Sequence, residues 1–142
     1  MDPATKRHAG ILIIILPTVI YGGVTILGFL INDPAYMQNP LRQNLFRAGH
    51  AHAGVLLILS LVALLYVDEA NLSNAWKWVV KTFIPLAAIF LPAAFFFSVL
   101  SPGATKPNGF INLAYVGVGL LVTGLLALGI GLTRRKKDEL KI

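Results

Sequence analysis

The chain has 142 residues, of which 56% are hydrophobic, and its formal net charge is +6. Its mean hydropathy of +0.75 exceeds that of ordinary soluble proteins, and its length corresponds to one domain. The sequence contains no cysteine. This excludes disulfides, cysteine-ligated iron–sulfur clusters and haem attached through a C-x-x-C-H motif.

Four apolar runs are each long enough to cross a bilayer, which takes about 20 helical residues. They cover residues 9–31, 46–67, 78–100 and 110–132. The first run is too long for the apolar core of a cleavable signal peptide. We therefore predict an all-α fold in which residues 1–142 form a single integral membrane domain, an antiparallel four-helix bundle with short loops.

Lysine and arginine are unevenly divided between the two sides of this predicted bundle. The termini and the middle loop, to which Lys77 and Lys81 are assigned, carry nine of them, whereas the other two loops carry three, Arg42, Arg47 and Lys106. The positive-inside rule then predicts that both termini are cytoplasmic, in a multi-pass protein of a prokaryotic-type plasma membrane. The basic tail, 133–142, is typical of a stop-transfer segment that favours anionic lipid, so no nucleic-acid partner is expected.

Proline and its neighbours predict where the helices bend or begin. Pro17 predicts a kink in the first helix, and Pro85 and Pro92 predict interruptions in the third, because proline removes a backbone hydrogen-bond donor. Asn39 followed by Pro40 predicts an N-cap and a first helical residue, so the second helix could begin before its apolar run.

Glycine recurs every seven residues in the last run, at Gly117, Gly124 and Gly131. Small residues at this spacing allow a neighbouring helix to approach closely, so they predict a packing seam.

Carboxylates are expected only at or beyond the membrane edges. No buried carboxylate is therefore expected for proton coupling, and no hydrolase constellation is evident. The six acidic residues are Asp2, Asp33, Asp68, Glu69, Asp138 and Glu139. With carboxylates excluded, the histidines are the main candidates for catalytic or ligand-binding side chains.

Two histidines, His50 and His52, lie in a segment rich in glycine and alanine at the outer end of the second run. At 1.5 Å per residue they should lie about 6–9 Å below the start of that run. Residues two apart on a helix point about 200° apart, so one metal ion or one haem is not expected to be clamped by both rings.

Three interpretations of these histidines stay open. In the first, they only bond across helices, for example to Asn112 or Tyr115. In the second, they ligate haem b, with Arg47 pairing with a propionate and Phe96 packing against the macrocycle. In the third, either histidine binds copper or zinc together with Met37 or a second subunit. The candidate cofactor-binding residues are thus His50, His52, Arg47, Phe96, Asn112 and Tyr115, and the candidate metal ligands are His50, His52 and Met37.

The segment Arg47-x-x-His50-x-His52, leading into an apolar helix, resembles the start of the second transmembrane helix in catalytic subunits of haem–copper oxidases and nitric oxide reductases. Short four-helix membrane proteins that are similar to a fragment of those subunits carry a comparable His-Ala-His segment. The resemblance covers about ten residues and implies that His50 is an axial ligand of a low-spin haem. Because the last two runs contain no histidine, it implies haem binding or electron transfer rather than reduction of oxygen or nitric oxide.

The leading hypothesis is therefore a small membrane protein that binds haem b, or a transition metal, near the outer leaflet and serves electron transfer. Whether the chain is an enzyme is left open. The alternative is a non-enzymatic homo-oligomeric pore or an accessory subunit of a membrane complex, with structural or pH-sensing histidines. Both hypotheses include contact with the lipid bilayer and either a homo-oligomer or a partner membrane subunit.

Overall fold

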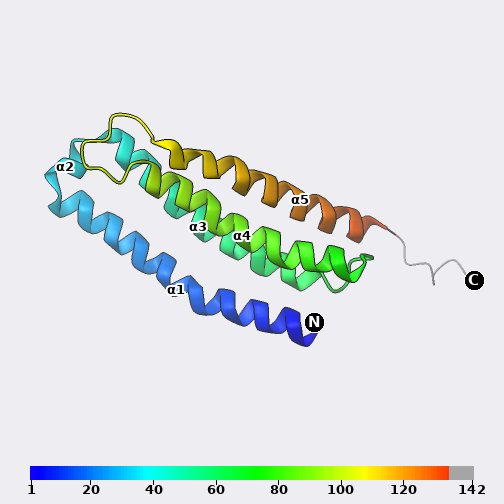
Figure 1. The fold of residues 1–142 in the computed structure, drawn as a ribbon. Helices are drawn as coiled ribbons and strands as arrows, with labels where there is room; N and C mark the ends of the chain where they lie inside the picture. Colours follow the sequence, from blue (N-terminus) through cyan, green and yellow to red (C-terminus); the bar gives the residue numbers. More distant parts are fainter. Residues whose placement is uncertain (135–142) are drawn as a thin grey trace, which may run out of the picture.

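The computed structural model describes residues 1–134 (Figure 1). Most of the basic tail, including Asp138 and Glu139, falls outside the described residues. The prediction of an all-α chain with four membrane-length helices is confirmed. The elements are α1 (Pro3–Asn32), the short α2 (Pro34–Met37), α3 (Pro40–Tyr66), α4 (Asn74–Ser98), the 3₁₀ turn η1 (Gly109–Asn112) and α5 (Leu113–Thr133).

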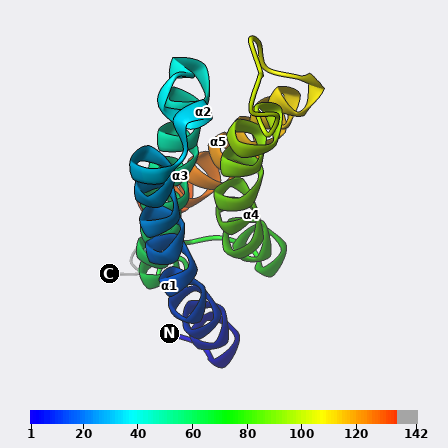
Figure 2. The same cartoon turned by 90° about the vertical axis from the view of Figure 1, so that its left-hand side faces the viewer.

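The four long helices form a bundle in which α4 is the central member. Helices α3 and α5 both pack along α4, whereas α1 packs chiefly on α3 (Figures 1 and 2). The N-terminus, the turn between α3 and α4, and the end of α5 all lie at the same end of the bundle (Figure 1). That this end of the bundle is the cytoplasmic one stays a prediction.

Helices α1, α3 and α4 begin earlier than the apolar runs because polar caps lie outside those runs. Asp2, Asn39 and Ser73 accept hydrogen bonds from backbone N–H groups in the first turns of α1, α3 and α4. The predicted cap at Asn39 is thereby confirmed, with Arg42 N 3.1 Å from Asn39 Oδ1.

The interruptions predicted in the third helix are wrong, since α4 runs continuously through both of its prolines. Helix α1 is also continuous through Pro17, and the kink there stays a prediction. A membrane helix tolerates proline because neighbouring groups and small local adjustments satisfy the freed carbonyls.

The glycine seam lies between α5 and the rest of the same chain. A methyl group added at Gly117 would lie 2.7 Å from Leu91, and one added at Gly124 would lie 2.6 Å from Ile84. All three seam glycines are buried. The predicted packing seam is therefore a contact within one chain, because α4 and the turn before it occupy it.

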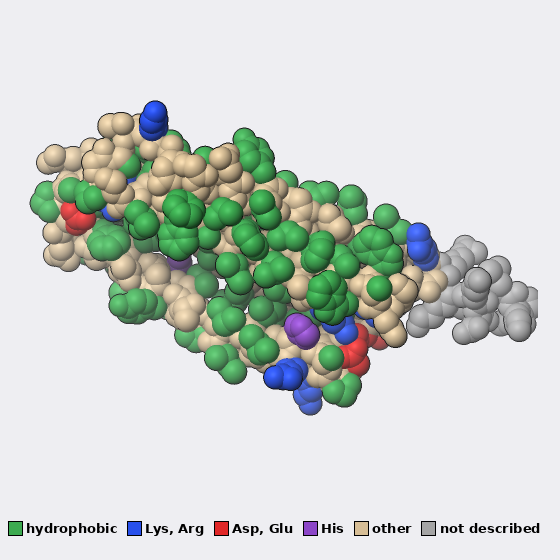
Figure 3. Space-filling model, viewed as in Figure 1, with side chains coloured by type: hydrophobic (Ala, Val, Ile, Leu, Met, Phe, Trp, Pro, Cys, Tyr) green, Lys and Arg blue, Asp and Glu red, His purple; other side chains and the backbone are tan. Residues whose placement is uncertain are grey.

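Apolar side chains cover the outside of the bundle along its length, while charged groups gather at its two ends (Figure 3). Helix α1 is the most exposed, because only 6% of its most apolar 18-residue window is buried. Contact of such an apolar surface with water is unfavourable, whereas contact with the hydrocarbon core of a bilayer is not. The chain is a multi-pass membrane protein in contact with the lipid bilayer.

Candidate functional site: two histidines on α3

His50 points from α3 toward α1. Its ring lies against the paired glycines of α1, and a methyl group added at Gly23 would come within 2.9 Å of His50 Nε2. The side chain is half-buried. Within residues 1–134, neither ring nitrogen of His50 makes a hydrogen bond, which is unusual for a polar group at membrane depth.

His52 points instead toward α4. Its ring centroid lies 5.1 Å from that of Phe95, and its Nδ1 lies 2.7 Å from the carbonyl oxygen of Ala48. A neutral imidazole in this contact donates its proton from Nδ1, which leaves the lone pair on Nε2. The same arrangement orients many histidines that ligate metals. His52 is exposed on the surface of the bundle, so its Nε2 is accessible.

The two rings therefore lie on different flanks of α3, in agreement with their separation along the helix. No group of three or more His, Asp or Glu side chains within residues 1–134 could hold a metal ion. Neither ring therefore belongs to such a group in the described part of the chain.

Two of the other predicted site residues lie near the histidines but have partners of their own. Arg47 donates from Nη2 to Gln43 Oε1 at 3.0 Å, one turn toward the end of the bundle. Phe96 fills the contact between α3 and α4, since a methyl group added at Gly49 would lie 3.0 Å from its ring. The Phe96 ring also meets Phe46 edge-on, with centroids 5.4 Å apart.

The remaining predicted residues are not brought to the histidines. Asn112 and Tyr115 lie at the start of the α5 segment, and Tyr115 is 79% exposed. Met37 is exposed on the short helix α2. Among residues 1–134, no hydrogen bond or ring contact joins any of these three to a histidine, so their roles stay predictions.

The packing determines where a haem would fit. A macrocycle on His50 Nε2 does not fit the observed contact, because the backbone of α1 at Gly23 covers that nitrogen. His52 offers a better fit, because its ring is exposed and its tautomer is set by the Ala48 carbonyl. The geometry thus favours His52 over His50, the reverse of what the resemblance implies.

Sequence reasoning missed a buried cation near the start of α4. It assigned Lys81 to a loop, whereas the residue lies in the second turn of α4 and is 8% exposed. Lys81 Nζ lies 2.8 Å from Asp2 Oδ2 and 3.3 Å from Asp68 Oδ1. The Lys81 ammonium holds the pKa of Asp2 well below its usual range, helped by the backbone N–H of Thr5.

A second buried cation, Arg42, lies at the opposite end. Its Nε donates to the carbonyl of Val99 at 3.1 Å, where α4 ends, and its guanidinium carbon is 5.2 Å from the centroid of the Phe46 ring.

Arg42 Nη1 and the Tyr36 hydroxyl are both buried without a hydrogen-bond partner within residues 1–134. Burial raises the pKa of Tyr36. The early helix start at Pro40 is the signal that could have placed Arg42 inside the helix.

The fold and these contacts define a small four-span membrane protein with a charged cluster at one end, a buried arginine at the other and two divergent imidazoles between them. No protein-family model, curated protein sequence or solved structure matches the chain.

Proposed function

We propose that the chain binds haem b, or a copper or zinc ion in its place, through an imidazole of α3 and takes part in electron transfer. The observation that carries this proposal is the state of His52, an exposed ring whose Nδ1 contacts the Ala48 carbonyl and whose Nε2 has no partner within residues 1–134. Imidazole nitrogen is a common ligand of haem iron, copper and zinc, and haem would supply one-electron chemistry at this position.

The second axial ligand would come from another polypeptide. His50 cannot supply it within the same chain, because its ring lies on the other flank of α3. A homo-oligomer or a partner membrane subunit would bring an additional side chain to the exposed His52 ring. Arg47 lies three residues before His50, on the same face of α3, and five residues before His52. As a partner for a haem propionate it therefore suits the His50 side of α3.

The test is an absorption spectrum and a metal analysis of the full chain purified in detergent from haem-replete cells. We expect a Soret band, or bound copper or zinc, that is lost in His52→Ala and retained in His8→Ala. His8 is a matched control, because its Nδ1 also contacts a carbonyl oxygen four residues back, that of Ala4, at 2.8 Å. Protein that is colourless and metal-free would overturn the proposal.

The close packing of His50 supports a second candidate function, that of an accessory subunit or oligomeric pore in which the histidines are structural or pH-sensing. An imidazole between α1 and α3 would couple protonation to the fit of the two helices. This function predicts a discrete oligomer, or a stoichiometric partner, that survives mild solubilisation without haem. A monomer with bound haem would exclude it.

A further inference from the structure

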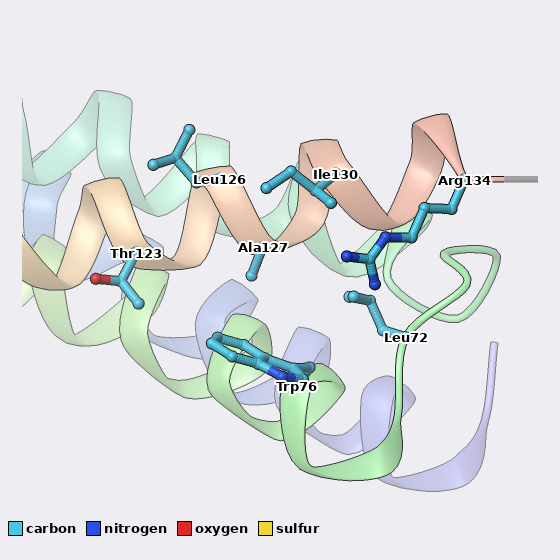
Figure 4. A pocket seen from close by; sticks show the side chains of 7 residues that line it. All are labelled: Leu72, Trp76, Thr123, Leu126, Ala127, Ile130 and Arg134. Atoms are coloured by element: carbon cyan, nitrogen blue, oxygen red, sulfur yellow. The ribbon is translucent and has the colours of Figure 1, made fainter.

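A groove of about 350 Å³ lies along α5 at the end of the bundle that carries the N-terminus. One face of α5 from Thr123 to Ile130 forms its floor, and Arg134 extends it just after the helix ends, a total length of about 16 Å at 1.5 Å per residue. The turn before α4 and the first helical turns of α4 form its wall, through Leu72 and Trp76 (Figure 4).

The polarity of the groove changes along its length. The lining that α5 contributes between Thr123 and Ile130 is apolar, with Leu126, Ala127 and Ile130, and the hydroxyl of Thr123 is already bonded to the Gly119 carbonyl at 2.8 Å. That part therefore offers a ligand no free hydrogen-bonding side chain and suits a hydrocarbon chain.

The free polar side-chain groups of the lining are the Arg134 guanidinium, just after the end of α5, and the Trp76 indole N–H on α4. Figure 4 shows Arg134 turned back over the groove toward Leu72, with the Trp76 ring lying beneath Ala127. Within residues 1–134, Arg134 has no carboxylate partner and the Trp76 indole N–H has no acceptor. An uncompensated guanidinium is a strong partner for a phosphate, which it can bind through two parallel hydrogen bonds.

We propose that this groove is a specific site for an anionic glycerophospholipid. One acyl chain lies along the α5 face, and the phosphate is held at the membrane edge by Arg134 and the Trp76 N–H. The charge of the groove selects a lipid with net negative charge over a zwitterionic one, since one cation near an anionic lipid surface changes affinity by about fivefold. The site is independent of any cofactor on α3.

Tryptophan fluorescence gives a direct readout, because the chain contains two tryptophans. In Trp78→Phe, Trp76 is the single emitter, and quenching by lipids with brominated acyl chains reports which lipid lies beside it. In mixed bilayers we expect brominated phosphatidylglycerol to quench Trp76 at a several-fold lower mole fraction than brominated phosphatidylcholine does.

Two further variants, each with a matched control, test the two parts of the site. Arg134→Gln should reduce the preference for phosphatidylglycerol by about fivefold, whereas Lys106→Gln, which removes a charge from the exposed loop before η1, should leave it unchanged. Ile130→Trp, read out by native mass spectrometry of retained lipid, should block the groove. Val122→Trp is its control, because both residues are 48% exposed but Val122 does not line the groove.

Equal quenching by the two lipids would overturn the proposal, because it would show that only general bilayer contact surrounds Trp76. So would an undiminished preference for phosphatidylglycerol in Arg134→Gln, or equal lipid retention by Ile130→Trp and Val122→Trp.

Discussion

Lys81 and Asp2 are bonded across 79 positions of the sequence, with Lys81 Nζ 2.8 Å from Asp2 Oδ2. The backbone N–H of Asp2 also donates to Asp68 Oδ2 at 2.7 Å, so the start of α1 is tied both to the turn that follows α3 and to α4. Helix α1 buries little of its surface elsewhere. The charged cluster, Asp2, Asp68 and Lys81, therefore acts as the anchor of α1 at this end of the bundle.

Removing the cation should release this anchor. We expect Lys81→Met to lower the free energy of unfolding by about 1.5–3 kcal/mol, because hydrogen bonds to charged groups are worth about that much. Lys106→Met, in an exposed loop, should change it by less than about 0.5 kcal/mol. Thermal unfolding in detergent measures both, and equal stability of the two variants would contradict the anchoring role.

Acid should weaken the same anchor. The pKa of Asp2 is lower in the folded chain than in the unfolded chain, so its contribution to stability is complete above the ordinary aspartate pKa of about 3.9. It is lost as the pH falls below that value, when the unfolded state binds the proton first. Asp2→Asn retains a capping side chain for Thr5 but cannot titrate. The melting temperature of the wild type should fall more steeply than that of Asp2→Asn below about pH 4.

The Tyr36 hydroxyl is buried without a partner, so removing it should not destabilise the chain. We expect Tyr36→Phe to raise the free energy of unfolding by about 1 kcal/mol, the lower range of the cost of an unsatisfied buried polar group. Arg42→Met should instead lower it by about 1.5–3 kcal/mol, since the guanidinium donates to the Val99 carbonyl. Destabilisation by Tyr36→Phe in the same thermal unfolding measurement would indicate that a bound water satisfies the hydroxyl.

The contact between Gly23 and His50 can be tested by adding side-chain volume on α1 and removing it from α3. Gly23→Ala places a methyl group 2.9 Å from His50 Nε2 and should cost about 1–3 kcal/mol, whereas Gly28→Ala meets no atom within 4 Å. Adding His50→Ala to Gly23→Ala should recover most of the loss, because the ring no longer competes for that space. A double-mutant cycle measures this coupling, and purely additive effects would contradict the contact.

The sequence predicted the parts of this fold that depend on neighbouring residues. The span of α3 follows from its apolar run, and its start at Pro40 follows from the Asn39 cap. The divergence of His50 and His52 follows from helical geometry alone. Each of these features is determined within a few turns of chain.

Features that depend on distant partners could not be predicted in this way. Lys81 falls just inside the third apolar run but was assigned to the middle loop, because a lysine near the end of such a run usually marks the membrane edge. The partner that stabilises its burial is 79 residues away. Helical geometry also gave the angle between the two histidines but not which flank of α3 faces α1. That depends on the contact between His50 and Gly23, which only the assembled helices form.

The glycine seam provides the most direct test of how α5 is held. At Gly117 an added methyl group would lie 2.7 Å from the Leu91 side chain and 3.1 Å from the Leu91 backbone nitrogen, which cannot move without displacing α4. Gly117→Ala should therefore lower the free energy of unfolding by about 1–3 kcal/mol. Gly119, two residues along the same helix, has no atom within 4 Å of the added carbon. There the same substitution should be neutral or stabilise by up to about 1 kcal/mol, because alanine has the higher helix propensity. Thermal unfolding of the two variants side by side would contradict the seam if Gly117→Ala proved no less stable than Gly119→Ala.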